Sequence, residues 1–310
     1  MKNPEFLVKE LLAGKQYACA RLISMVENKE KTAEIIKLIT PYIGKAYVIG
    51  ITGAPGVGKS TLTDRLVKLL RKENYKVGII AVDPTSPFSG GALLGDRIRL
   101  QQLSTDEGVF IRSMASRGHL GGISPATSDA IKILDAFGCD FIIVETVGVG
   151  QSEIEIVKNV DTTLLVLIPG MGDEIQAIKA GIMEIADIFV INKSDKEGVD
   201  RTVLELEMMK NLGEPRDRDI PVVKVTARDN IGIDNLKDAI IEHKTWLEKT
   251  SNFVKNRKAR IAMELKQIVH NRLLETSHKL IKEVENELVE KIYLKQKDIY
   301  GAVEEIIKNM

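Results

Sequence analysis

The stretch Gly53-Ala54-Pro55-Gly56-Val57-Gly58-Lys59-Ser60 constrains this chain more than any other part of its sequence. An apolar run at 46–52 precedes it, and leucines with helical spacing, Leu62 and Leu66, follow it. The order glycine, four residues, glycine, lysine and serine matches the Walker A loop between a strand and a helix. Its glycines let the backbone turn so tightly that successive N–H groups can point at one anion. We therefore predict a P-loop that binds a nucleoside triphosphate.

Within this loop, Lys59 adds a full positive charge, the following helix adds its partial positive end, and Ser60 offers a hydroxyl to magnesium. A glycine-rich turn that binds nothing is disfavoured, because the strand, the Lys-Ser pair and the helical pattern occur together. The residues expected to contact the nucleotide here are Gly53, Ala54, Pro55, Gly56, Val57, Gly58, Lys59, Ser60 and Thr61.

Whole-chain composition argues against several other classes of protein. The 310 residues carry 44 Lys and Arg against 44 Asp and Glu, so no net charge favours nucleic acid or a membrane surface. The two cysteines, Cys19 and Cys139, form no CxxC pair, which argues against a zinc site and fits a reducing compartment. No apolar run approaches the length of a bilayer span, and the start lacks a signal-peptide pattern. We expect a cytoplasmic protein with no nucleic-acid or membrane partner.

From residue 46 onward, short apolar runs alternate with helical stretches. The runs lie at 46–52, 77–82, 108–112, 140–145, 162–168, 187–192 and 220–225. Continuous apolar strands separated by helices predict an α/β fold, here a P-loop NTPase with a mostly parallel central sheet flanked by helices. In such sheets ligands sit at the carboxyl ends of the strands, so the residues that follow each run are the candidates for function.

Helical patterns also flank this nucleotide-binding domain, which we place at 45–250. Residues 3 to about 40 predict an N-terminal helical extension over 1–44 that packs on one flank. The stretch 254–297 is charged with periodic apolar residues, and a helix of that length favours a helical hairpin or a subunit arm. A short terminal helix follows at 299–307, so we assign 251–310 to a C-terminal helical region.

Two aspartates follow the second run. Asp83 stands at its carboxyl end, and this position favours magnesium or its water shell over a role as a turn former. Asp96 lies in the proline- and glycine-containing segment that comes next. A magnesium role for Asp96 and a role as the N-cap of a helix that starts near Arg97 remain equally open.

The fourth run resembles a Walker B strand. Four apolar residues lead to Glu145, and Gly148 stands where a glycine senses the γ-phosphate. The usual acid is aspartate, and the longer glutamate could reach magnesium through water or help to hold the attacking water. The residue after the glycine is Val149, where GTPases commonly carry glutamine, and Gln151 lies two further on. We therefore predict weak intrinsic hydrolysis, with a mobile element or a partner completing the site.

The sixth run ends in Asn192-Lys193-Ser194-Asp195, the guanine-recognition pattern of GTPases. Its aspartate accepts hydrogen bonds from N1–H and the 2-amino group of guanine, and adenine offers neither donor. Thr226-Ala227-Arg228, after the seventh run, fits a small-residue loop whose backbone closes over the base. The sequence thus predicts GTP and GDP as ligands, with Mg²⁺.

Taken together, these motifs resemble the methylmalonyl-CoA mutase-associated GTPase family (MeaB and ArgK), whose members have also been called arginine/ornithine (LAO/AO) transport ATPases. The resemblance covers nearly the whole chain. The stretches that carry it are 82–84, 94–96, 117–118, 120–122, 145–153, 172–179 and 192–195.

The family implies a G-protein chaperone that gates adenosylcobalamin loading of an acyl-CoA mutase and dimerises through carboxyl-terminal helices. By resemblance, Ser60, Asp83, Asp96 and Glu145 belong to the magnesium and phosphate site, where Lys59 and Glu145 are catalytic candidates. The segment 172–179 resembles a switch that answers to the client enzyme; Gln176 and Lys179, three residues apart on one predicted helical face, are further catalytic candidates. No cobalamin-ligating histidine motif is visible, so the cofactor itself need not bind here.

Three alternatives remain beside this hypothesis. A nickel-insertion GTPase would carry histidine- or cysteine-rich metal stores, whereas this chain has four histidines and no CxxC. An ATP-driven kinase or transport ATPase is disfavoured by Asp195. A nucleotide-gated binding protein, in which turnover hardly matters, stays open because of Val149. The sequence does not identify the client, whether a methylmalonyl-, isobutyryl- or other acyl-CoA mutase.

Overall fold

The computed structural model describes residues 3–83, 103–115, 125–146, 159–170, 186–212 and 217–308. The chain divides into two compact units, Met1–Phe253 and Val254–Met310. The first unit therefore contains both the N-terminal helices and the nucleotide-binding domain. The division into three parts at 44 and 250 stays a prediction.

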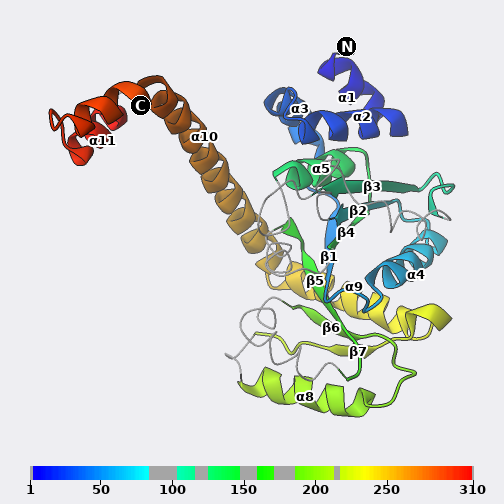
Figure 1. The fold of residues 1–310 in the computed structure, drawn as a ribbon. Coiled ribbons are helices and arrows are strands. Elements are labelled where there is room, and N and C mark those ends of the chain that lie inside the picture. Colours follow the sequence, from blue (N-terminus) through cyan, green and yellow to red (C-terminus); the bar gives the residue numbers. More distant parts are fainter. Residues whose placement is uncertain are drawn as a thin grey trace. The chain divides into compact units, whose positions relative to one another are not determined.

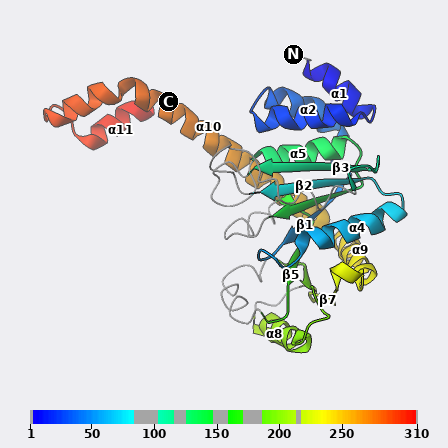
Figure 2. The ribbon, with the colours of Figure 1, turned by 45° about the vertical axis from the view of Figure 1, so that its right-hand side comes forward.

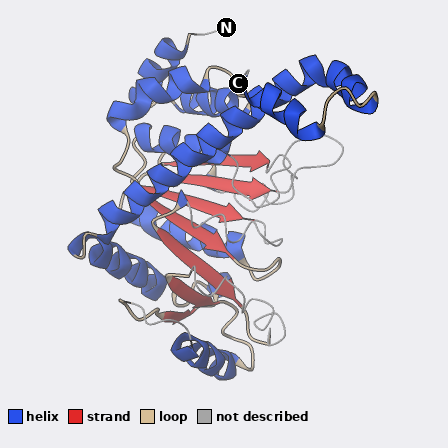
Figure 3. Ribbon diagram, turned by 90° about the vertical axis from the view of Figure 1, so that its left-hand side faces the viewer, coloured by secondary structure: helices blue, strands red, loops and turns tan. Residues whose placement is uncertain are grey.

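A seven-stranded sheet forms the centre of the first unit, in the order β3-β2-β4-β1-β5-β6-β7. Every pairing in it is parallel. The strands are β1 (Tyr47–Thr52), β2 (Val77–Asp83), β3 (Val109–Ala115), β4 (Phe141–Thr146), β5 (Thr162–Leu167), β6 (Ile188–Ile191) and β7 (Val222–Lys224). Each apolar run of the sequence is a strand, and the predicted α/β fold is confirmed. All the strands point to one edge of the sheet (Figure 3), which brings their carboxyl ends together.

Helices cover both faces of this sheet (Figures 1 and 2). On one face, α4 (Lys59–Lys72) and α9 (Ile233–Lys249) share a core with alternate residues of β1 and β5. On the other face, α5 (Pro125–Ala136) packs below the N-terminal helices, and α8 (Val199–Leu212) packs near β5 and β6. Leu164 and Val166 face the first core, whereas Leu165 and Leu167 face the second, as the two-residue period of a strand requires.

The N-terminal extension consists of α1 (Pro4–Leu12), α2 (Gln16–Glu27) and α3 (Thr32–Ile39), followed by a short 3₁₀ turn at Thr40–Tyr42. Its apolar stripes join the core around α5, with Leu22 and Ile35 fully buried. Arg112 of β3 donates to Ser24 of α2 at 3.0 Å and pairs with Glu27. The expected helical extension is thus confirmed and belongs to the same core as the sheet.

Two helices make up most of the described part of the second unit. The helix α10 (Asn252–Tyr293) runs for 42 residues without interruption, and α11 (Ile299–Lys308) follows after a short break. For residues 254–297 the sequence favoured a helical hairpin or a subunit arm. The structure shows a single helix as far as Tyr293 and no hairpin within it. Among the described residues of the second unit, the buried apolar ones are Leu288 of α10 and Ala302 of α11. Most other apolar side chains of α10 are exposed. Among the helices described, none has the length and apolar character needed to cross a bilayer.

Candidate functional site

The predicted phosphate-binding loop connects β1 to α4 at the carboxyl edge of the sheet. Gly53, Gly56 and Gly58 all have positive φ values, +139°, +79° and +97°, which side-chain-bearing residues adopt only at a cost. A Cβ on Gly53 would lie 2.2 Å from the carbonyl oxygen of Val166, so the close approach of the loop to β5 also requires glycine. The local sequence thus folds as the strand, loop and helix that phosphate binding needs.

Lys59 lies at the first position of α4, and its side chain turns back over the loop. Its Nζ donates to the carbonyl oxygens of Gly53 at 2.6 Å and Ala54 at 3.0 Å. The residue is only 7% exposed. The ammonium group is therefore held within the ring of loop peptides, where a phosphate would meet it together with their N–H groups.

Glu145 reaches the same helix from the end of β4 and is 6% exposed. The hydroxyl of Ser60 donates to its Oε1 at 2.6 Å, and the hydroxyl of Thr63 donates to its Oε2 at 2.9 Å. Sequence reasoning expected Ser60 and Glu145 together but missed Thr63. The available signal was its spacing, because Thr63 lies one helical turn after Ser60 on the same face of α4.

These oxygen donors fit magnesium, which prefers hydroxyl and carboxylate ligands to softer groups. Ser60 and Glu145 would hold the ion directly or through water. Asp83 ends β2, whose neighbouring residues Ala81 and Val82 pair with Glu145 and Thr146, so its backbone lies at the same sheet edge. No group of three potential ligands among His, Cys, Asp and Glu occurs in the described ranges.

Asn192 connects the predicted base motif to the phosphate loop. It follows β6, is 3% exposed, and donates from Nδ2 to the carbonyl oxygen of Val57 at 2.8 Å. Its Oδ1 accepts the N–H of Ala227 at 3.1 Å. The next residue, Lys193, donates to the carbonyl oxygen of Gly56 at 2.8 Å. One asparagine thus joins three segments that lie far apart in the sequence.

The loop Thr226–Arg228 lies beside this motif. Thr226 exchanges two backbone hydrogen bonds with Ile231, which closes the turn. Arg228 pairs with Asp229, and this pairing raises the pKa of the Arg228 guanidinium; the negative charge of Asp195 raises it further. Asp195 itself is exposed. The structure therefore brings the carboxylate that is predicted to read the base close to the predicted closing loop.

Known proteins resemble this chain over most of its length. The family model described as "Methylmalonyl Co-A mutase-associated GTPase MeaB" matches residues 19–282. The chain belongs to the MeaB family. A putative GTPase of Pyrococcus abyssi is 53% identical, covering 98% of this chain and 96% of that protein. The GTPase ArgK of Escherichia coli is 39% identical, covering 77% and 76%.

A solved structure supports the same conclusion about the fold. The crystal structure of a LAO/AO transport system kinase matches with a TM-score of 0.72 and 26% identity, covering 99% of this chain and 98% of that one. This MeaB-family chain is accordingly a P-loop GTPase, with the sheet and flanking helices that the sequence predicted.

Several predicted residues of the MeaB-family site lie outside the described ranges. They are Asp96, Gly148, Gln176 and Lys179, together with Val149 and Gln151. Their roles stay predictions. The structure describes the backbone of Asp83 but not its side chain. The nucleotide loop, Glu145, the asparagine motif and the loop at 226–228 are the parts that the geometry brings together.

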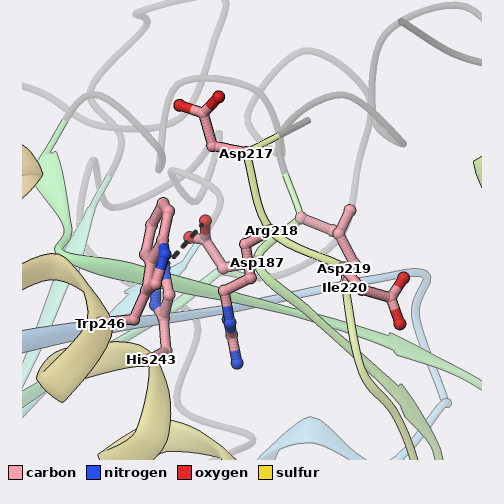
Figure 4. Close-up of a pocket in the computed structure, with 8 residues that line it drawn as sticks. Asp187, Asp217, Arg218, Asp219, Ile220, His243 and Trp246 are labelled. Atoms are coloured by element: carbon pink, nitrogen blue, oxygen red, sulfur yellow. Dashed lines mark ion pairs between the residues drawn. The ribbon is translucent and has the colours of Figure 1, made fainter. Parts of the chain in front are cut away.

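A cavity of about 270 Å³ lies at the opposite, amino-terminal edge of the sheet (Figure 4). Asp187 precedes β6 there, and His243 and Trp246 of α9 stack with ring centroids 5.7 Å apart. His243 is buried and bonds Thr162 at 2.7 Å; burial, and then the charge of Arg218, lower its pKa to about 4. None of the predicted nucleotide residues that the structure describes lines this cavity.

Proposed function

We propose that this GTPase is a G-protein chaperone that gates the loading and protection of adenosylcobalamin in an acyl-CoA mutase. The observation that carries the proposal is the match of residues 19–282 to a family described as associated with methylmalonyl-CoA mutase. The nucleotide site supports the proposal, because Asn192 links its phosphate loop to its base loop. A protein that gates cofactor loading needs such a site to distinguish GTP from GDP. Methylmalonyl-CoA mutase or a related acyl-CoA mutase is then the partner.

In the proposed cycle, the loop peptides and Lys59 bind the phosphates, and Asp195 reads the guanine edge. Asn192 sets the distance between the two, because it bonds both Val57 of the phosphate loop and Ala227 of the base loop. Ser60 and Glu145 would hold Mg²⁺, which would supply positive charge against the developing negative charge of the phosphates. Water attacks the γ-phosphorus and releases GDP and phosphate.

Hydrolysis by the isolated chain is proposed to be slow. Val149 stands where a water-orienting glutamine is common, and Gln176 and Lys179 are proposed to enter the site when the client binds. Groups supplied by such a partner contribute about 10³ to 10⁵ in rate in other GTPases. Nucleotide turnover would then be coupled to the mutase.

We further propose a cytoplasmic homodimer formed through the second unit. Ile261, Leu265 and Ile268 are spaced as one face of α10 and are 65%, 63% and 54% exposed. An apolar helical stripe of this kind is stabilised when a second helix covers it. No cobalamin, nucleic-acid or membrane site is proposed on this chain.

A nucleotide-dependent pull-down from the source cytosol tests the proposed function. The tagged chain is loaded with a non-hydrolysable GTP analogue or with GDP, and captured proteins are identified by mass spectrometry. We expect an acyl-CoA mutase whose recovery differs between the two states. The variant Lys59→Ala, which loses the phosphate-binding ammonium, is the control and should abolish that difference. Recovery of no acyl-CoA mutase in either state would leave only the GTPase activity.

A further inference from the structure

We propose that Arg65, which lies outside every nucleotide motif of the sequence, is a positioning residue for guanine recognition. It holds the loop Thr226–Arg228 against α4, the helix that begins at the phosphate loop. This inference rests on the proposed role of that loop in closing over the base. It adds a residue whose effect on nucleotide affinity is exerted through the backbone of the loop.

The contact consists of two hydrogen bonds to consecutive carbonyl groups. Nε of Arg65 donates to the carbonyl oxygen of Ala227 at 3.2 Å, and Nη2 donates to that of Arg228 at 3.2 Å. A planar guanidinium presents two such donors in a fixed fork, whereas a lysine presents a point charge. Oδ2 of Asp64 lies 3.9 Å from Nη1, which is beyond hydrogen-bond distance, and accepts from Lys68 at 2.9 Å instead. The side chain of Arg65 is 32% exposed, so these bonds are partly shielded from water.

Ala227 is fixed from two sides as a result. Its N–H donates to Oδ1 of Asn192 at 3.1 Å, and its carbonyl oxygen accepts from Arg65. The residue is 1% exposed. Asn192 therefore attaches the loop to the phosphate loop and the base motif, and Arg65 attaches it to the body of α4. Loss of the second attachment removes the side-chain hydrogen bonds by which Arg65 holds the loop to α4.

The position of Arg65 along α4 explains why this attachment concerns the nucleotide. Arg65 lies six residues after Lys59, which places it about 9 Å along the helix axis from the phosphate-binding end. One rigid helix thus carries both the phosphate contacts and the support of the base loop. A loop that is held in its binding conformation before the ligand arrives loses less conformational entropy on binding.

The test compares Arg65→Met, which keeps the aliphatic stem without donors, with Arg65→Lys and with the control Lys72→Met. Lys72 is exposed on the same helix. Binding is measured with a fluorescent ribose-labelled GDP, and steady-state hydrolysis with GTP. We expect the dissociation constant of Arg65→Met to rise about tenfold, or about 1.4 kcal/mol. Arg65→Lys should lie between Arg65→Met and wild type, and Lys72→Met should match wild type.

Two further readouts separate positioning from a general structural role. The KM for GTP should rise in Arg65→Met while kcat stays within about twofold, because the loop contacts the base and not the reacting phosphate. Hydrogen exchange of the nucleotide-free protein should increase over residues 226–231 and stay unchanged over the strands. A fall in kcat with unchanged exchange at 226–231 would instead indicate a structural role and overturn the inference.

Affinity for GDP within twofold of wild type in Arg65→Met would also overturn it. If Arg65→Met does not fold, Arg65→Lys decides, and wild-type affinity in that variant overturns the inference in the same way. A wild-type chain that binds no GDP would refute the assignment of the base loop itself. Failure of the mutase pull-down with the predicted Arg65 effects intact would refute only the chaperone function.

Discussion

Replacing Gly58 by alanine tests the connection between the phosphate loop and the base motif. Gly58 has a φ of +97°, and a Cβ built on it would lie 2.4 Å from Nδ2 of Asn192. No real contact is that short, so the amide of Asn192 has to move. Its bonds to Val57 at 2.8 Å and Ala227 at 3.1 Å would then be lost.

The expected loss in the free energy of unfolding of Gly58→Ala has two separate contributions. A residue with a side chain in this left-handed region costs on the order of 1–3 kcal/mol in backbone strain. Each hydrogen bond of Asn192 contributes about 1 kcal/mol net. Gly56→Ala is the matched control, because Gly56 has a φ of +79° but its Cβ would meet nothing within 4 Å. The strain is therefore common to both variants, and Gly58→Ala should be the less stable by about 2 kcal/mol.

Urea unfolding without nucleotide, followed by circular dichroism, measures this difference in the free energy of unfolding. We expect Gly58→Ala to unfold at clearly lower urea than Gly56→Ala. If the two variants unfold within about 0.5 kcal/mol of each other, Asn192 does not make the described connection in solution.

Two other variants address buried polar groups. Thr63→Val keeps the shape of the side chain but removes the donor to Oε2 of Glu145. We expect the free energy of unfolding to fall by about 1–2 kcal/mol in this variant and to stay close to wild type in Thr63→Ser. Equal losses in both variants would contradict the role of the hydroxyl. Because the pKa of His243 is about 4 in the fold and about 6.5 in the unfolded chain, the unfolded chain binds more protons between these values. Stability should therefore fall as pH drops below about 6.5, by about 2 kcal/mol between pH 7 and pH 5 relative to His243→Gln. If His243→Gln shows the same pH dependence of stability as wild type, His243 is not the cause of that dependence.

The sheet was predictable because its inner strands β1, β4, β5 and β6 are buried on both faces and therefore appear as continuous apolar runs. The residues at which the strands begin and end were less predictable. The run at 220–225 forms a strand only at Val222–Lys224, because β7 is an edge strand with three residue pairs to β6. The run at 108–112 continues instead to Ala115, because β3 stays paired with β2 as far as Asp83.

The site was predictable where each of two partners belongs to a recognisable motif. Ser60 and Glu145 meet because both follow from the strand-end rule. Thr63 and Arg65 were missed because no motif includes them, so nothing in the sequence pointed to their partners 82 and 162 residues away. Nothing near Arg65 in the chain shows that its guanidinium faces two carbonyl groups, and only the packing of α4 against the loop at 226–228 reveals it.

Equilibrium binding of GDP, ADP and xanthosine diphosphate to wild type and Asp195→Asn tests the guanine assignment most directly. We expect wild type to prefer GDP by a factor on the order of 10⁴ over ADP, since adenine leaves the carboxylate unpaired. In Asp195→Asn, GDP should bind weakly and xanthosine diphosphate should be preferred. The reason is that the asparagine amide places an N–H donor where the carboxylate offers only acceptors. Equal binding of ADP and GDP by wild type, or unchanged GDP affinity in Asp195→Asn, would show that Asp195 does not select the base.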